Sequence, residues 1–145
     1  MKKLIAILAL ALLFASCKKE EKTQESSIIP NSFMGRSVQV QGTVEVGNKK
    51  VDILIWDSGQ IDGDIVSLYV NGKEIIANYT LTASKKRLPV TLDNKGYNYI
   101  LLYAHNEGSL PPNTCAVSLD DGAGEKNLVL SADLKTNGAY NIVVK

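Results

Sequence analysis

Apolar and polar residues alternate with a period of two over most of the chain beyond residue 37. The pattern is clear in 38–46, where four valines are separated by Gln, Gly, Thr and Glu residues. Alternation of this kind is typical of β-strands that bury one face. Similar patterns predict further strands over 51–56, 65–70, 73–77, 88–92, 97–106, 114–119, 127–131 and 139–144. No window of eleven or more residues after Cys17 shows the period of a helix.

The segments between these strands are rich in Gly, Asn and Asp, which are the residues of tight turns. Asn71-Gly72 is typical of a type I′ turn and predicts that 73–77 returns antiparallel to 65–70. Short strands with such turns at regular spacing predict an all-β fold, an antiparallel β-sandwich of about eight strands. A small β-barrel is the alternative.

The first sixteen residues have the pattern of a signal peptide. Met1-Lys2-Lys3 is cationic, and residues 4–15 form an unbroken apolar run of 12 residues. As a helix this run would be roughly 18 Å long, well short of the ~30 Å hydrocarbon core of a bilayer. The length therefore favours a cleaved signal peptide over 1–16 and not a permanent membrane span.

Ala15-Ser16-Cys17, directly after the apolar run, resembles a bacterial lipobox. The resemblance implies cleavage after Ser16, a thioether-linked lipid on the Cys17 sulfur, and acylation of the new amino terminus. An ordinary secretory signal followed by an unrelated cysteine is the alternative. No Asp follows Cys17, and the charged run 18–22 resembles the export signal of surface lipoproteins. The expected location is the outer membrane, on its periplasmic side or at the cell surface.

Residues 17–42 are mostly polar and are predicted to be a lipidated cysteine followed by a flexible tether. The sandwich domain is then expected over 43–145. The apolar residues of the tether, Ile28, Ile29 and Phe33 among them, could dock on the domain, but a linker is the prediction.

The charge of the chain is close to neutral, formally +1, and stays so without the predicted signal peptide. No basic excess is available for a phosphate backbone, which excludes nucleic acid as the expected partner. The chain has two cysteines, so lipidation of Cys17 leaves Cys115 alone in a strand-like run. Cys115 is expected to be a small buried hydrophobic residue and not a nucleophile.

The segment 56–64 places Asp57, Asp62 and Asp64 in a connection between two strands. Several oxygen ligands on a loop with glycines suit a hard cation such as Ca²⁺. The spacing is not that of an EF-hand, and Asp residues also bind the backbone of their own turns. The loop is therefore either a Ca²⁺ site or a structural turn, and no other cofactor is expected.

A second candidate ligand-binding loop follows the long strand at 97–106. It carries His105, the only histidine, with Glu107 and Asn113, and two prolines stiffen it. Trp56 joins this candidate set because an exposed aromatic ring would favour sugar binding. The alternative is an ordinary stiff connection between the sheets of a sandwich.

Trp56-Asp57-x-Gly59-x-x-Asp62-Gly63-Asp64 and Ala104-x-Asn106-Glu107-Gly108-x-x-Pro111-Pro112-Asn113-Thr114, with Asp121-Gly122, resemble a small domain of secreted proteins and lipoproteins in Gram-negative bacteria. The similarity spans about 51–144. It implies a secreted β domain and no catalytic residues.

The expected function is that of a membrane-anchored lipoprotein with a non-catalytic binding or structural module. The expected partners are the membrane, through the lipid, and an envelope protein or polysaccharide. The alternatives are a Ca²⁺-dependent glycan-binding module and a hydrolase that uses Asp62, Asp64 or Glu107. An enzyme is not the prediction, since no nucleophile or metal triad accompanies these carboxylates.

Overall fold

The computed structural model describes residues 26–145, so the predicted signal peptide and Cys17 lie outside the described residues. The described residues form ten strands and no helix long and apolar enough to cross a membrane. The strands are β1 Ser32–Phe33, β2 Arg36–Val46, β3 Lys50–Trp56, β4 Ile65–Val70, β5 Lys73–Thr80, β6 Lys86–Thr91, β7 Tyr97–Ala104, β8 Asn113–Asp120, β9 Glu125–Ala132 and β10 Thr136–Val144.

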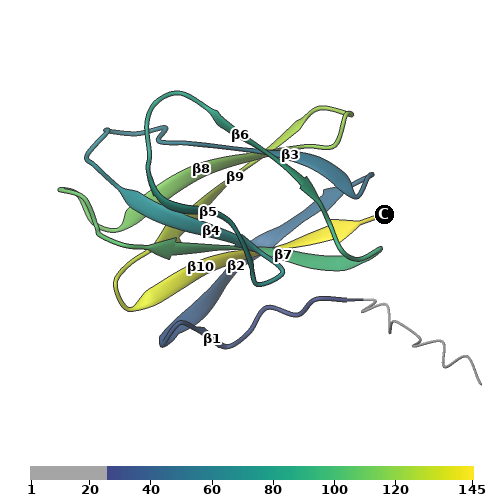
Figure 1. Cartoon of the computed structure of the whole chain (residues 1–145), viewed down its shortest axis with the longest axis horizontal. Coiled ribbons are helices and arrows are strands. Elements are labelled where there is room, and N and C mark those ends of the chain that lie inside the picture. Colours follow the sequence, from purple (N-terminus) through teal and green to yellow (C-terminus); the bar gives the residue numbers. More distant parts are fainter. Residues whose placement is uncertain (1–25) are drawn as a thin grey trace, which may run out of the picture.

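The strands are arranged in two sheets that face each other, so the predicted β-sandwich is confirmed (Figure 1). One sheet has the order β1-β2-β10-β7-β4-β5 and the other β6-β3-β8-β9. All neighbouring strands are antiparallel except β2 and β10, which run parallel from Ser37↔Thr136 to Val46↔Val144. The sandwich is therefore mixed at this one pair, and ten strands replace the expected eight.

The core fills the space between the sheets with one face of each strand. In β3, Val51, Ile53 and Ile55 point inward while the residues between them are half-buried on the outer face. This is the alternation that the sequence shows. At the turn between β4 and β5, Asn71 and Gly72 have φ of 52° and 79°, as a type I′ turn requires.

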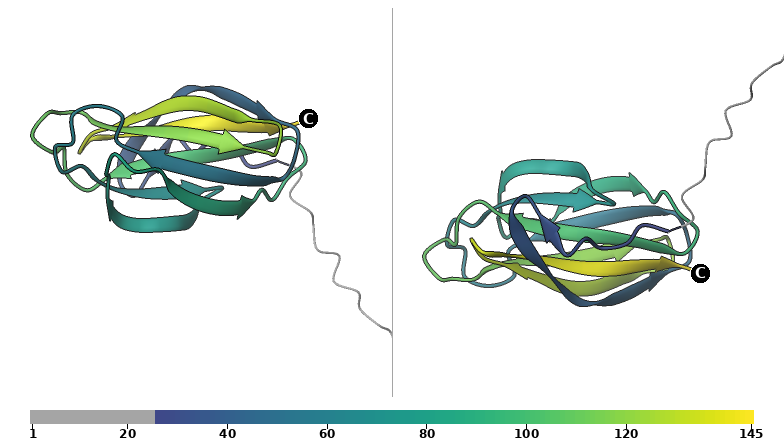
Figure 2. Two further views of the ribbon diagram at one scale, coloured as in Figure 1. Left: turned by 90° about the horizontal axis from the view of Figure 1, so that it is seen from above. Right: turned by 90° about the horizontal axis from the view of Figure 1, so that it is seen from below.

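Strand β7 is buried on both faces, which is unusual for a sandwich strand. Its inward residues Ile100, Leu102 and Ala104 belong to the main core. Its outward residues Tyr99 and Leu101 belong to a second apolar cluster with Tyr69 and Ala139. The segment from Ser26 to Gly35, hereafter the strap, lies across this outer face and covers the cluster with Ile29 and Phe33 (Figure 2).

The strap is held by polar and aromatic contacts along its length. The Ser27 amide donates to the Tyr97 carbonyl at 2.9 Å, and the Phe33 carbonyl accepts a bond from the Asn137 side chain at 2.9 Å. The Phe33 and Tyr69 rings meet edge to face with centroids 4.7 Å apart. Residues 26–42 are therefore part of the sandwich, and the predicted tether over 17–42 with a domain boundary at 43 is wrong in this part. The polar composition of this segment suggested a linker because β2 buries only one side, and its small apolar residues therefore alternate with polar ones.

The sandwich has two ends with different loops. The tether end, where the described chain begins, carries the loops 47–49, 71–72, 92–96 and 121–124. The motif end carries the loops 57–64, 81–85, 105–112 and 133–135. In Figure 1 the motif end is on the left and the tether end on the right, with the last residue of the chain.

Candidate functional site

The two motif-bearing loops, 57–64 and 105–112, lie against each other at the motif end. Asn106 joins them: its side-chain oxygen accepts from the Ile65 amide at 2.7 Å, and its side-chain nitrogen donates to the Gly63 carbonyl at 2.8 Å. The two loops therefore lie at the same end of the sandwich. The antiparallel pairing of β4 with β7 produces this placement, because β4 begins where β7 ends.

Asp62 makes the second link between the loops. Its carboxylate accepts a hydrogen bond from the Leu110 amide at 2.8 Å. Gly108 allows this approach, because a Cβ at that position would lie 2.5 Å from an Asp62 carboxylate oxygen. Gly108 also has a φ of +58°, so both the space and the backbone conformation favour glycine.

Asp64 makes the third link and is the most buried acid of the group. It is 3% exposed, and one carboxylate oxygen accepts from the Thr114 amide at 3.1 Å. Its other oxygen has no hydrogen-bond partner among the described residues. Burial raises the pKa of Asp64, and the charges of Asp62 and Asp57 raise it further, against the lowering effect of the Thr114 amide.

The remaining two acids of the loops also bind backbone amides. Asp57 accepts from the Gly59 amide at 2.9 Å, and Glu107 accepts from the Leu134 amide at 3.2 Å. Residues 26–145 contain no group of three His, Cys, Asp or Glu side chains placed to hold a metal ion. Asp57 thus stabilises its own turn, whereas Asp62, Asp64 and Glu107 link their loops to other segments of the motif end.

The other predicted ligand-binding residues are not gathered into one pocket. Trp56 lies on the four-stranded sheet, with the Lys85 ammonium 4.7 Å from its ring centroid, and Lys85 also pairs with Glu125 at 2.6 Å. His105 bonds the Ser67 hydroxyl at 2.8 Å beside the six-stranded sheet. Asn113 is fully buried and donates to the Asn106 carbonyl at 3.4 Å. Trp56 is thus half-buried beneath Lys85, and Asn113 supports the loop from inside.

Cys115 points into the main core and is fully buried. Burial raises the pKa of its thiol to about 12, with a smaller contribution from the charges of Asp57 and Asp64. The thiol is therefore protonated at neutral pH. The expectation that Cys115 is a buried hydrophobic residue is confirmed.

Three exposed aliphatic side chains at the motif end were not singled out by the sequence reasoning. Ile61 is 56% exposed, Leu110 53% and Leu134 49%. Each stands beside one of the links described above, because Asp62 binds the Leu110 amide and Glu107 binds the Leu134 amide. The signal in the sequence was an isolated aliphatic residue in each of three polar loops.

Asp121, in the Asp121-Gly122 pair that accompanies the two longer motifs, has the corresponding linking role at the tether end. Its carboxylate accepts from the Gly47 amide at 2.5 Å and the Ala123 amide at 3.1 Å, and pairs with Lys126 at 3.0 Å. The Gly47 amide is the main cause that lowers the pKa of Asp121 to about 2, followed by Lys126. Asp121 thereby ties the β2–β3 loop, which connects the two sheets, to the β8–β9 loop of the four-stranded sheet.

Replacement of this carboxylate should weaken the sandwich. Asp121→Asn is expected to lower the free energy of unfolding by about 2 kcal/mol at pH 7, because charge-assisted bonds to two amides and a lysine are lost. The folded-state pKa lies below its usual value of 3.8, so the carboxylate stabilises the fold above pH 4 and loses this effect as the pH falls towards 2. Chemical denaturation between pH 7 and pH 2 checks both points. Asp120→Asn is the control, since Asp120 accepts only from the Gly122 amide among the described residues, and an equal loss in this variant would contradict the prediction.

The motif end is thus a set of loops fastened by side-chain-to-backbone bonds, with aliphatic side chains exposed on its surface. The Pro111-Pro112 peptide bond in this region is cis. Loops held in one conformation are suited to binding, because little conformational entropy is lost on contact.

Comparison with known protein families, with curated proteins and with solved structures finds no match to this chain.

Proposed function

We propose that this chain is a lipid-anchored outer-membrane protein whose sandwich presents its motif end to an envelope protein. The observation that carries the proposal is the opposite placement of the motif loops and the start of the described chain (Figure 1). Only eight residues separate Cys17 from Ser26, a reach of at most about 30 Å. A chain anchored at Cys17 therefore holds the tether end near the membrane and directs the motif end away from it.

Aliphatic exposure at the motif end supports a protein partner over a polysaccharide. Ile61, Leu110 and Leu134 offer apolar area without an aromatic ring on which a sugar face could stack. Lys85 lies over the half-buried Trp56 ring, and Arg36 lies over the half-buried Tyr103 ring with the guanidinium carbon 3.9 Å from its centroid. Full burial of one large aliphatic side chain contributes ~1.5–3 kcal/mol, so covering the exposed halves of these three would contribute ~2–5 kcal/mol to binding.

The role of the carboxylates supports binding over catalysis. Asp62 and Glu107 each accept a bond from a backbone amide of a neighbouring loop, and Asp64 accepts one from the Thr114 amide at the start of β8. A glycosidase-type hydrolase needs two carboxyl groups facing each other across a substrate cleft. The acids here are used for loop positioning, which leaves the hydrolase as the weaker alternative.

Replacement of the predicted lipidation site should release the protein from the membrane. In a Cys17→Ala chain no thiol is present for the lipid, so the protein is expected to move from the detergent phase to the aqueous phase or the precursor fraction. Detergent-phase partitioning of wild-type and variant protein measures this. Unchanged lipid labelling and partitioning of the variant would contradict the anchor.

Contact at the motif end can be tested in intact cells with a photoreactive amino acid at position 110. One envelope protein is expected to form an adduct there, and none from position 50, an exposed lysine at the start of β3 at the tether end. Ile61→Ser with Leu134→Ser should reduce the adduct about tenfold or more, because two apolar contacts are lost. Equal adducts from both positions, or an adduct unaffected by the double substitution, would contradict a partner at the motif end.

Calcium binding at the motif end is the second candidate function. The observation that favours it is the buried, unpartnered oxygen of Asp64, near the charges of Asp57 and Asp62. Crowded carboxylates can either take up a proton or bind a cation. A cation here would assist a glycan-binding role of the loops.

Thermal melting in the presence of Ca²⁺ tests this candidate. A calcium site requires that millimolar Ca²⁺ raise the melting temperature, because a ligand selective for the folded state stabilises it by RT ln(1 + [L]/Kd). Asp62→Asn with Asp64→Asn should abolish the shift, while Asp52→Asn on the outer face of β3 should preserve it. A wild-type melting temperature that does not respond to calcium would leave the acids with their linking role.

A further inference from the structure

A hollow at the tether end is lined by three lysines. Its volume is about 330 Å³, and it is bounded by Gly47, Asn48, Lys49, Lys95, Val144 and Lys145. These residues come from the loop after β2, the loop before β7 and the end of β10. The volume falls within the range of ~300–1,000 Å³ that is usual for small-ligand pockets.

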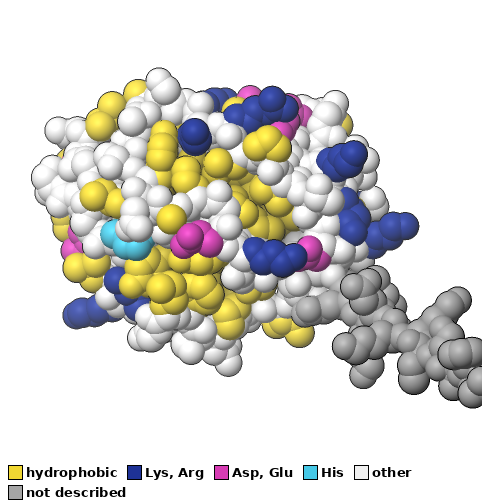
Figure 3. All heavy atoms as spheres, in the orientation of Figure 1, with side chains coloured by type: hydrophobic (Ala, Val, Ile, Leu, Met, Phe, Trp, Pro, Cys, Tyr) yellow, Lys and Arg dark blue, Asp and Glu magenta, His cyan; other side chains and the backbone are white. Residues whose placement is uncertain are grey.

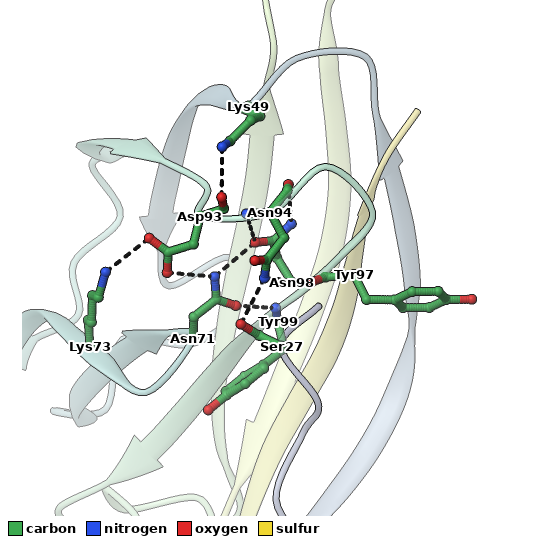
Figure 4. Close-up of polar contacts among 9 residues, drawn as sticks. All are labelled: Ser27, Lys49, Asn71, Lys73, Asp93, Asn94, Tyr97, Asn98 and Tyr99. Carbon is green, nitrogen blue, oxygen red and sulfur yellow. Dashed lines mark hydrogen bonds and ion pairs between the residues drawn. The ribbon is translucent and has the colours of Figure 1, made fainter. Parts of the chain in front are cut away.

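The positive charge of this hollow is only partly balanced by the described residues. Lys49 donates to the backbone carbonyl of Asp93 at 2.7 Å and not to its carboxylate, as Figure 4 shows. The Asp93 carboxylate is taken by Lys73 and Asn71, which lower its pKa. Lys145 pairs with the exposed Glu45 at 2.7 Å, while Lys95 forms no ion pair with a carboxylate of residues 26–145. Lys145 is thus paired with Glu45, the charge of Lys49 acts on nearby Asp93, and Lys95 is the lysine of the hollow without a carboxylate partner among residues 26–145.

The loop that carries Lys95 is held in place by a network of buried amides. The Asn98 side chain accepts from the Asn94 amide at 3.1 Å and donates to the Gly96 carbonyl at 3.2 Å. The Asn94 side chain in turn donates to the Ser27 hydroxyl at 2.9 Å (Figure 4). The position of Lys95 is therefore fixed relative to the start of the strap, and the hollow does not depend on a mobile loop.

The same end exposes groups that suit the surface of a bilayer. Ile28 is 84% exposed and Tyr97 is 54% exposed. They are held near each other because the amide of Ser27 donates to the carbonyl of Tyr97. Tyrosines with one apolar and one polar side collect at membrane interfaces, and lysines there meet lipid phosphates. In Figure 3 several basic side chains lie on the right-hand side, where the tether end lies, and others lie along the top and at the lower left.

We propose that the tether end is a membrane-docking face, in which Lys49, Lys95 and Lys145 bind the phosphate headgroups of the bilayer that holds the lipid anchor. This inference rests on the proposed function, because the anchor at Cys17 is what brings the hollow within about 30 Å of the bilayer. Ammonium groups bind phosphate oxygens as point charges, so no single headgroup shape is required. Docking would orient the sandwich so that the motif end faces away from the membrane.

The test measures lysine acylation on the mature lipidated protein in two kinds of vesicle. One is phosphatidylcholine alone, and the other contains equal parts of phosphatidylcholine and phosphatidylglycerol. Acylation of Lys49, Lys95 and Lys145 is expected to be about fivefold slower on the anionic vesicles, the factor by which one lysine near such a surface favours contact. Lys86 and Lys135 near the motif end are internal controls that should react at equal rates.

Variants and a soluble probe separate the remaining explanations. Lys95→Gln should restore much of the reactivity of Lys49 and Lys145 on anionic vesicles, whereas the matched Lys86→Gln should not. Inorganic phosphate added to protein on phosphatidylcholine vesicles should give no protection. Protection by inorganic phosphate alone would identify a free-phosphate site and overturn membrane docking, as would equal rates in all conditions or equal protection of Lys86 and Lys135. Protein that fails to float with either vesicle would overturn the anchor as well, and flotation distinguishes this from loss of docking alone.

Discussion

A chain that starts at Gly42 is expected to lose its cooperative unfolding transition. This truncation removes the strap and the first half of β2, and with them the pairing of Ser37 through Val40 with β10. It also exposes Leu101, Tyr99 and Tyr69 on the outer face of the six-stranded sheet. Burial of these three side chains contributes about 5 kcal/mol or more, which is comparable to the whole stability of a small domain.

The Arg36 side chain adds to this loss. Its guanidinium donates to the Ala104 carbonyl at 2.6 Å and the Asp133 carbonyl at 3.1 Å, which joins β2 to two loops of the motif end. Circular dichroism melting and binding of a hydrophobic dye measure the effect. A chain that starts at Ser26 keeps all contacts described here and is the matched control. A Gly42 chain that melts within a few degrees of this control would mean that the strap contributes little.

Most of the sandwich could be predicted from the sequence because its signals are local. Strands β3, β7 and β8 have clear alternation or apolar runs, and the type I′ turn at Asn71-Gly72 has its own sequence signature. Strand direction places Asp57 and Asp64 at one end of the sandwich, but only the pairing of β4 with β7 brings the loop after Asn106 to the same end. The buried Cys115 could be expected from its strand-like surroundings.

The strap and the parallel strand could not be predicted because they depend on distant contacts. Residues 26–35 have too few apolar side chains for a periodic signal, and only the apolar outer face of β7 shows why Ile29 and Phe33 are partly buried. The sequence did show that Tyr99 and Leu101 share a face of β7. It did not show what covers that face, because nothing local relates residue 29 to residue 101.

The role of the acids was ambiguous for a different reason. Carboxylates such as Asp62, Asp64 and Glu107 can bind cations, take part in catalysis or accept hydrogen bonds from backbone amides. These three uses give similar sequence patterns. Only the positions of the Leu110, Thr114 and Leu134 amides show what the carboxylates contact. The exposed aliphatic residues beside them had no periodic pattern and were therefore overlooked.

Gln41 provides a contact between the sheets that no sequence pattern indicates. Its side-chain amide pairs with edge strand β9 as a neighbouring strand would: the nitrogen donates to the Ser131 carbonyl at 2.8 Å and the oxygen accepts from the Ser131 amide at 3.0 Å. Gly138 in β10 makes room for it. A Cβ at Gly138 would lie 2.9 Å from both polar atoms of the Gln41 side chain and even closer to the Ser131 carbonyl oxygen.

Gly138→Ala is therefore expected to lower the free energy of unfolding by about 3 kcal/mol, which combines overpacking with the loss of both Gln41 bonds. The melting temperature should fall by roughly 10 °C. Gly59→Ala is the control, because a Cβ there would meet only the Asp57 carboxylate at an ordinary 3.7 Å. Gln41→Leu removes the bonds without adding a Cβ at 138, so its smaller loss of about 2 kcal/mol separates the two causes. If Gly138→Ala melts like the control, the Gln41 side chain does not pair with Ser131 of edge strand β9 in solution.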